Sequence, residues 1–204
     1  MSRLLGFAIA VLIAASGAVQ AGPIHDAAAA NDAALIMRLI EGGASVDELN
    51  EVGETALIVA AKSANADVIN ILVHNKADVD FTDPTGKRAL HWVVLNTGSP
   101  AVVGSIRFLY EKLADMNARD ADGATALILA ANAGEGLTVS ILMSGLGTEL
   151  EATANDGKTA LTRAGLKGHK TIVTMLMRLG AKCQTIDPAW REACEARRAE
   201  LGLT

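Results

Sequence analysis

The segment from Asn50 to Asp80, NEVGETALIVAAKSANADVINILVHNKADVD, decides the fold of this chain. A Gly-x-Thr-Ala-Leu phrase opens a short alanine-rich helix, a turn follows, and a second apolar helix ends before Ala-Asp-Val-Asp. Isolated helices of this length are marginal in water. The segment therefore predicts a two-helix unit that is stable only when similar units pack against it.

Similar phrases recur along the chain and begin at Gly53, Gly86, Gly123 and Gly157, at intervals of 33, 37 and 34 residues. Glycine permits a positive-φ turn between units, and the Thr that usually follows two positions later can cap the next helix. With its 33-residue period, the segment resembles an ankyrin repeat. The resemblance covers most of the chain.

The resemblance implies an all-α solenoid of about five stacked helix-turn-helix units joined by short β-hairpin loops. The units are expected at residues 22–49, 50–82, 83–119, 120–153 and 154–183. The first is truncated, because residues 23–28, Pro-Ile-His-Asp-Ala-Ala, match the family's Thr-Pro-Leu-His-x-Ala-Ala phrase without its first residue. A first unit without a hairpin suits a terminal capping repeat.

The third unit departs from the pattern. Arg88 replaces the capping Thr, Trp92-Val93-Val94 stands where other units have small residues, and about four extra residues fall around residues 96–100. Insertions in repeat proteins usually extend loops, often on the binding face. The departures make this unit a candidate for function.

Residues 184–204 predict a C-terminal capping helix. Asp187 is a suitable N-cap, and Pro188 suits the first helical position. The face expected to cover the last unit carries Trp190, Ala193, Cys194, Arg197 and Leu201.

Residues 1–21 predict a secretory signal peptide. Arg3 precedes an uncharged run, and Val19 and Ala21 are the small residues expected before a cleavage site. The alternative is an uncleaved membrane anchor, although the apolar run is shorter than the ~20 residues of a span. Cleavage after Ala21 would place the protein in the periplasm or outside the cell, with no stable membrane span.

Cys183 and Cys194 are the two cysteines of the chain. In an exported protein they would form a disulfide that joins the capping helix to the last unit. The alternative is a pair of buried free thiols.

Composition and motifs argue against several functions. The net charge is −5 and basic residues are scattered, so a nucleic-acid-binding face is not expected. His25 and His91 occupy the structural His position of the family, and His169 lies in a turn between helices. Nucleophile, metal-ligand and phosphate-loop motifs are not found, so we expect neither an enzyme nor a cofactor.

In ankyrin repeats, partners contact the hairpin tips and the exposed side of the first helix of each unit. Carried over by position, the candidate partner-binding residues are Glu51, Glu54, Lys62, Thr85, Lys87, Trp92, Leu95, Asn96, Asp122, Asn132, Asp156 and Lys158. Trp92 is the strongest candidate, because aromatic anchors dominate interface energetics. The alternative is that Trp92 fills the space left by absent alanines.

The resemblance and the N-terminus together predict a non-catalytic protein-binding module, a monomer by itself, in the periplasm of a Gram-negative bacterium. It would inhibit, protect against or assist an envelope enzyme. A host-directed secreted effector is the alternative, although such export would not usually begin with a cleavable signal. An enzyme is a further alternative, for which the sequence shows no catalytic constellation.

Overall fold

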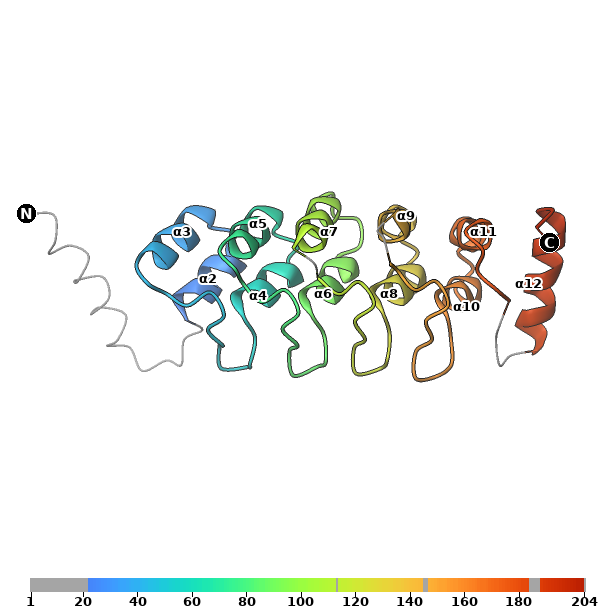
Figure 1. Cartoon of the computed structure of the whole chain (residues 1–204), viewed down its shortest axis with the longest axis horizontal. Coiled ribbons are helices and arrows are strands. Elements are labelled where there is room, and N and C mark those ends of the chain that lie inside the picture. Colours follow the sequence, from blue (N-terminus) through green and yellow to red (C-terminus); the bar gives the residue numbers. More distant parts are fainter. Residues whose placement is uncertain (1–21, 113, 145–146, 184–187, 204) are drawn as a thin grey trace, which may run out of the picture.

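The computed structural model describes residues 22–112, 114–144, 147–183 and 188–203. Two parallel rows of short helices form an elongated stack, and long loops project from one side (Figure 1). The expected signal peptide and the expected N-cap Asp187 lie outside the described residues. The all-α ankyrin solenoid expected from the sequence is confirmed.

Each unit contributes one helix to each row. The inner row, next to the loops, contains α2 (Pro23–Ala29), α4 (Ala56–Lys62), α6 (Ala89–Leu95), α8 (Ala126–Ala133) and α10 (Ala160–Leu166). The outer row contains α3 (Ala33–Glu41), α5 (Ala66–His74), α7 (Ala101–Glu111), α9 (Gly136–Ser144) and α11 (Lys170–Arg178). The final helix, α12 (Pro188–Glu200), stands across the end of the stack. None of the described helices combines the length and apolar character that a bilayer span requires.

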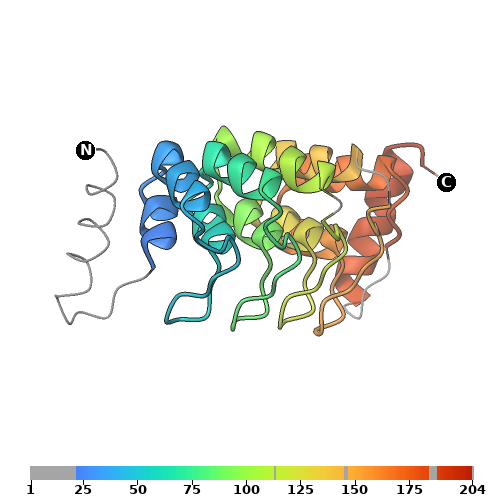
Figure 2. The same ribbon diagram turned by 60° about the vertical axis from the view of Figure 1, so that its left-hand side comes forward.

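The loops between units are hairpin-shaped but contain almost no regular strand pairing. A view turned by 60° shows them side by side below the inner row (Figure 2). In the described part of the chain, the only isolated bridge is the antiparallel pair Thr153 and Thr159. Each loop is instead closed near its tip by a few hydrogen bonds, as in the pair Asp83 N to Lys87 O at 2.9 Å.

Three of the inner helices begin at the predicted caps. The hydroxyls of Thr55, Thr125 and Thr159 accept hydrogen bonds from the backbone N–H three residues later. Arg88 cannot do this, because guanidinium has no acceptor. In the third unit the backbone N–H of Arg88 instead donates to His91 Nδ1 at 3.0 Å.

Small residues in the inner row allow close packing between units. Ala60 and Ala61 of α4 are fully buried, and Val93 and Val94 take their places in α6. By this register Trp92 corresponds to Val59 and not to either alanine. Trp92 therefore does not fill the alanine positions.

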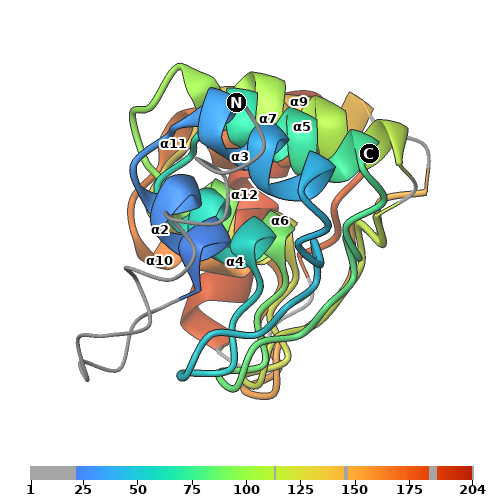
Figure 3. The same ribbon diagram turned by 90° about the vertical axis from the view of Figure 1, so that its left-hand side faces the viewer.

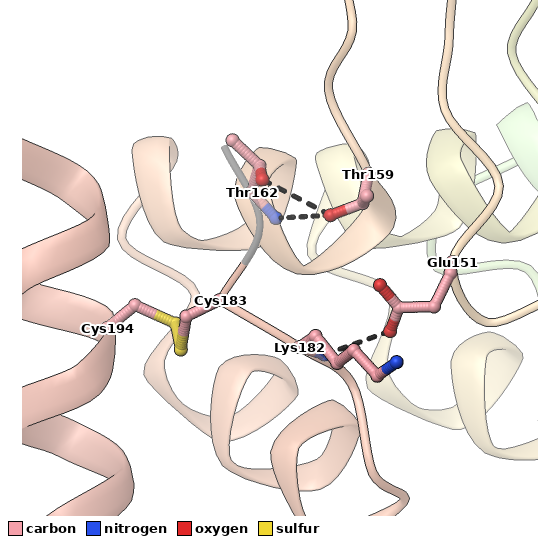
Figure 4. Close-up of a disulfide and its surroundings, with 6 residues drawn as sticks. All are labelled: Glu151, Thr159, Thr162, Lys182, Cys183 and Cys194. Carbon is pink, nitrogen blue, oxygen red and sulfur yellow. Dashed lines mark hydrogen bonds between the residues drawn. A yellow bond between two sulfur atoms is a disulfide. The ribbon is translucent and has the colours of Figure 1, made fainter. Parts of the chain in front are cut away.

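The capping helix is tied to the last unit by a disulfide and by an aromatic side chain. Cys194 is fully buried and bonded to Cys183, with 5.7 Å between their Cα atoms (Figure 4). A Cβ built on Gly165 would lie 1.8 Å from the Trp190 ring, so only glycine fits beneath that ring. The prediction of which side of α12 covers the last unit is only partly right, because Ala193 and Arg197 are exposed. Their positions lie at the edge of the contact.

Candidate functional site

A concave surface lies between the loop tips and the exposed side of the inner helices. The view along the stack shows the loops extending away from the helix rows (Figure 3). Between the loops and α8 and α10 this surface deepens into a groove of about 280 Å³. We call the whole concave surface the loop groove.

The loop tips are held in shape by side chains at equivalent positions. Asn50 Oδ1 accepts hydrogen bonds from the backbone N–H of Val52 and Glu54. Asp120 Oδ1 accepts two in the same way, from residues 122 and 124. These bonds replace the missing strand ladder and fix the tip backbone.

Neighbouring tips pack directly on one another. Gly123 has φ +72°, and a Cβ there would lie 2.9 Å from Asn155 N. Asn155 N also donates to Asp122 O at 2.9 Å. The equivalent Gly86 has φ +77° and lies equally close to Ala121. Only glycine satisfies both the positive φ and the close approach, so the tips form a continuous wall.

One position of the inner helices faces the loop groove in four successive units. It is occupied by Val59, Trp92, Leu129 and Arg163, all of which are half-buried. The row is apolar, aromatic, apolar and then cationic. The floor of the loop groove therefore changes in character along the stack.

Trp92 is held in a fixed orientation. Its indole Nε1–H donates to Asp83 Oδ2 at 2.7 Å. Lys62 Nζ lies 4.6 Å and Lys87 Nζ 5.7 Å from the ring centroid, within the range of cation–π attraction. Lys62 also forms an ion pair with Glu54. The ring is an ordered part of the groove floor, with its N–H already satisfied.

The Asp83 carboxylate organises this region. Burial works to raise its pKa, but hydrogen bonds from the Thr85 hydroxyl, the Lys87 backbone, the Trp92 indole and the Thr85 backbone outweigh burial. The net effect holds the pKa of Asp83 below its ordinary value, so Asp83 is ionised at neutral pH. An ionised Asp83 ties the third loop to the groove floor.

The basic side of the third loop meets the acidic side of the fourth. Lys87 Nζ lies 3.6 Å from Asp120 Oδ2, and the Asp120 side chain is almost inaccessible to solvent. The groove of about 280 Å³ follows, lined in part by Asp122, Asn132 and Asp156. The centre of the loop groove is therefore aromatic, with lysines that are paired to carboxylates, and the groove beyond it combines Asp122 and Asp156 with the cation of Arg163.

Asp156 is the charged centre of the fifth loop. It forms ion pairs with Lys158 at 2.7 Å and Arg163 at 2.8 Å. The hydrogen bond from Lys158 is the main cause that lowers the pKa of Asp156; burial opposes it, and Arg163 adds to it. These three side chains are partly exposed, so a partner can compete for their ion pairs.

The structure divides the twelve predicted partner-binding residues into groups. One cluster around the indole contains Glu54, Lys62, Lys87 and Trp92. A second group, in the groove of about 280 Å³, contains Asp122, Asn132 and Asp156, with Lys158 on its edge. Glu51 and Thr85 are at tips and Leu95 at the exposed end of α6.

Asn96 has a structural role in addition to its predicted one. Its side-chain N–H donates to Ala61 O at 2.9 Å and to Trp92 O at 3.0 Å. Asn65 makes the equivalent cross-unit bond to Ala28 O at 2.8 Å. The amide of Asn96 is thus engaged in joining the second and third units.

The groove residues that the sequence-based selection missed include Val59, Asp83, Leu129 and Arg163. Three of them could have been found, because Val59, Leu129 and Arg163 occupy the register of Trp92. Asp83 could not, since its bond to the indole depends on how the loop folds back over α6.

The histidines are used as scaffold. His91 Nε2 bonds to Ala118 O at 2.9 Å, and His169 Nε2 to Asn132 O at 3.1 Å. Burial is the main cause that lowers the pKa of His91, although Ala118 O and Asp120 oppose it. His91 is therefore neutral at pH 7 and accepts at Nδ1 while donating from Nε2. Among the described residues, no three His, Cys, Asp or Glu side chains form a metal-binding group.

Comparison with known proteins agrees with this architecture. The family described as Ankyrin repeats (3 copies) matches residues 24–120 and 101–187. Human neurogenic locus notch homolog protein 1 is 33% identical over 151 residues, and the Xenopus tropicalis protein is 31% identical over 149 residues. Each match covers 72% of this chain and 6% of the relative.

Another relative is the palmitoyltransferase AKR1 of Lachancea kluyveri, which is 27% identical over 159 residues, or 78% of this chain and 21% of that protein. The chain thus corresponds to only a small part of these larger proteins. The repeats identify a non-catalytic protein-binding module. This chain belongs to the ankyrin repeat family.

Proposed function

We propose that this protein is exported to the periplasm of a Gram-negative bacterium and there binds another protein in the loop groove. It acts as a monomer that inhibits, protects against or assists an envelope enzyme. Residues 1–21 support export by their resemblance to a signal peptide. The Cys183–Cys194 disulfide supports it as well, since disulfides persist in oxidising compartments.

The observation that carries the proposal is the ordered indole of Trp92 on the groove floor. Two lysines lie over its ring and a carboxylate holds its N–H. A ring fixed before binding loses little conformational entropy when a partner covers it. Apolar Val59 and Leu129 lie at the same position in the neighbouring units. The floor therefore offers a preorganised anchor of the kind found at interface hot spots.

Charge adds selectivity to this anchor. Lys62 and Lys87 at the centre are paired with Glu54 and Asp120. Acidic groups of a partner would compete for these lysines, whereas basic groups would bind Asp122 and compete for Asp156 further along. A partner segment with an acidic half and a basic half would fit in one direction only. The loop groove is thus suited to a specific partner rather than to many.

Affinity purification from the periplasmic fraction tests the proposal. Wild type is compared with Trp92→Ala, with Lys87→Glu and with the matched charge reversal Arg107→Glu on the outer helix α7. Wild type and Arg107→Glu are expected to retain one reproducible partner, and the two groove variants to lose it. Equal capture by all four proteins would place the binding surface elsewhere. Absence of any reproducible partner would contradict the proposed function.

A further inference from the structure

We propose that a second docking surface lies on the outer side of the last two units and takes an acidic amphipathic helix of a partner protein. The surface spans α9, α11 and α12, on the opposite side of the stack from the loops (Figure 1). It is separate from the loop groove and shares no residue with it. We call it the α11 surface.

The α11 surface consists of two adjoining depressions. One, of about 700 Å³, lies between α9 and α11, and the other, of about 480 Å³, lies between α12 and the end of α10 with the first turn of α11. Lys170 and Arg197 line both, so the depressions meet across α11. Together they form one open surface that extends from α9 to α12.

The floor of the α11 surface is apolar. Met143 and Met175 are half-buried against the core, and Leu179 is 49% exposed at the end of α11. Ser140 and Ser144 supply only small side chains from α9, which leaves the depression open. Methionines adapt their shape to different apolar partners. An exposed apolar floor with a polar rim is typical of an interaction site.

The rim of the α11 surface is basic. Lys170, Arg178 and Arg197 line the depressions, and none of the described lining residues is acidic. Arg197 forms an ion pair with Glu200 at 2.8 Å, but both side chains are largely exposed. For Lys170 and Arg178 the described residues provide no ion pair. This concentration of positive charge stands out in a chain of net charge −5.

The spacing of the cations matches a helix. Lys170, Thr174 and Arg178 follow one another at four-residue intervals on one face of α11. Lys170 and Arg178 are therefore about 12 Å apart along the axis. A partner helix with two carboxylates eight residues apart and apolar residues between them would pair with both cations and cover the methionines. The chemistry favours such a helix over an anionic membrane, which usually needs four or more clustered cations.

A synthetic peptide tests the α11 surface in the intact protein. The probe is a labelled helical peptide of about 18 residues, with Glu residues eight apart and Leu and Phe on the same face. The control peptide has Gln in place of Glu. Binding is followed by fluorescence anisotropy, and its location by the NMR methyl signals of Met143 and Met175.

We expect saturable binding that shifts both methionine signals, and a dissociation constant that rises about tenfold or more with the Gln peptide. The double variant Lys170→Glu/Arg178→Glu should weaken binding as much, whereas Arg107→Glu, also a charge reversal on an outer helix, should change it less than about twofold. Circular dichroism checks that each variant is folded. If the double reversal unfolds, Lys170→Gln/Arg178→Gln replaces it, with the same expectation.

Several outcomes would overturn the inference. One is equal binding of the Glu and Gln peptides, and another is binding that leaves Met143 and Met175 unshifted. An equal loss in Arg107→Glu would show a general charge effect. Binding to vesicles of anionic lipid but not to the peptide would assign the surface to a membrane. Because Trp92→Ala leaves the α11 surface intact, failure here is distinguishable from failure of the proposed function.

Discussion

The second and third units follow one plan but use different bonds to maintain it. In the second unit the Thr55 hydroxyl caps the inner helix, and Asn50 shapes the loop. In the third unit His91 takes over at the start of the helix, and Asp83 shapes the loop. Where Arg88 replaces the capping Thr, a different hydrogen bond of the same unit holds the start of the helix, because His91 Nδ1 accepts from the Arg88 backbone N–H.

The third unit also has a hydrogen bond from an indole on its inner helix to its loop that the second unit lacks. Its loop side chain, Asp83, accepts two hydrogen bonds beyond the repeat pattern, one from the Thr85 hydroxyl and one, from the Trp92 indole N–H, that reaches the inner helix. In the second unit the corresponding residues are Asn50 and Val59, and the Val59 side chain has no N–H or O–H that could donate such a bond. The bond from the indole links loop and inner helix across the groove. This comparison teaches that replaced repeat residues preserve the scaffold, while the added bond shapes the candidate site.

The largest expected difference between the units concerns the loop side chains. Asp83→Ala should lower the free energy of unfolding by about 3 kcal/mol, because it leaves the indole N–H and the loop N–H groups without a hydrogen-bond acceptor. Asn50→Ala should cost about 1 kcal/mol, since its bonds lie at a more exposed tip. Urea denaturation followed by circular dichroism measures both values.

A conservative change separates the two interactions of Asp83, with the loop backbone and with the Trp92 indole. Asp83→Asn keeps an acceptor for the loop but can turn an N–H toward the indole N–H. An intermediate loss of about 1–2 kcal/mol is expected. Equal losses for Asp83→Ala and Asn50→Ala would show that the bond to Trp92 adds no stability, and the contrast between the units would fail.

The side-chain amides that bond to the preceding unit should contribute equally to stability in the second and third units. Asn65→Ala and Asn96→Ala each remove a hydrogen bond to a backbone carbonyl of the preceding unit. Each should lower the free energy of unfolding by about 1–2 kcal/mol. Denaturant midpoints of the two variants provide the measurement. If Asn96→Ala costs nothing, the insertion near residues 96–100 is not anchored as the structure shows.

The smallest expected difference is one of pH dependence. The pKa of His91 is lowered in the folded protein, whereas an unfolded histidine titrates near 6.5. As pH falls below about 6.5 the unfolded state binds more protons, so the contribution of His91 to stability is lost on acidification. The second unit has Ile58 at this position and lacks this effect.

Converting the third unit to the second tests the pH dependence. The variant Arg88→Thr/His91→Ile supplies a hydroxyl cap in place of the imidazole. Between pH 7 and pH 5 it should lose less stability than wild type, as measured by urea denaturation at each pH. An identical loss in the two proteins would mean that His91 is not held neutral by burial.

Much of the scaffold could be predicted from the sequence. The Gly-x-Thr-Ala-Leu phrases located the loops and the caps Thr55, Thr125 and Thr159, because turn and cap chemistry is local. Helices α2 to α11 fall in pairs within the expected unit ranges.

Contacts between units could not be predicted in this way. In the sequence Gly165 is one small residue among others, and only the structure shows that the ring of Trp190 packs directly on it. The meeting of Lys62, Lys87 and Trp92 likewise depends on the register between three segments. Such contacts follow from how units stack, and the repeat pattern alone does not specify that geometry.

The central claim is that a partner binds in the loop groove at the third unit, and in vivo photo-crosslinking tests it most directly. Leu95 on the inner helix and Val103 on the outer helix belong to the same unit and are equally exposed, at 38%. A benzoylphenylalanine at each position compares the two sides of the stack. We expect a specific adduct at Leu95 that disappears in Trp92→Ala, and none at Val103. Equal adducts at both positions, or a Leu95 adduct that persists without Trp92, would contradict the claim.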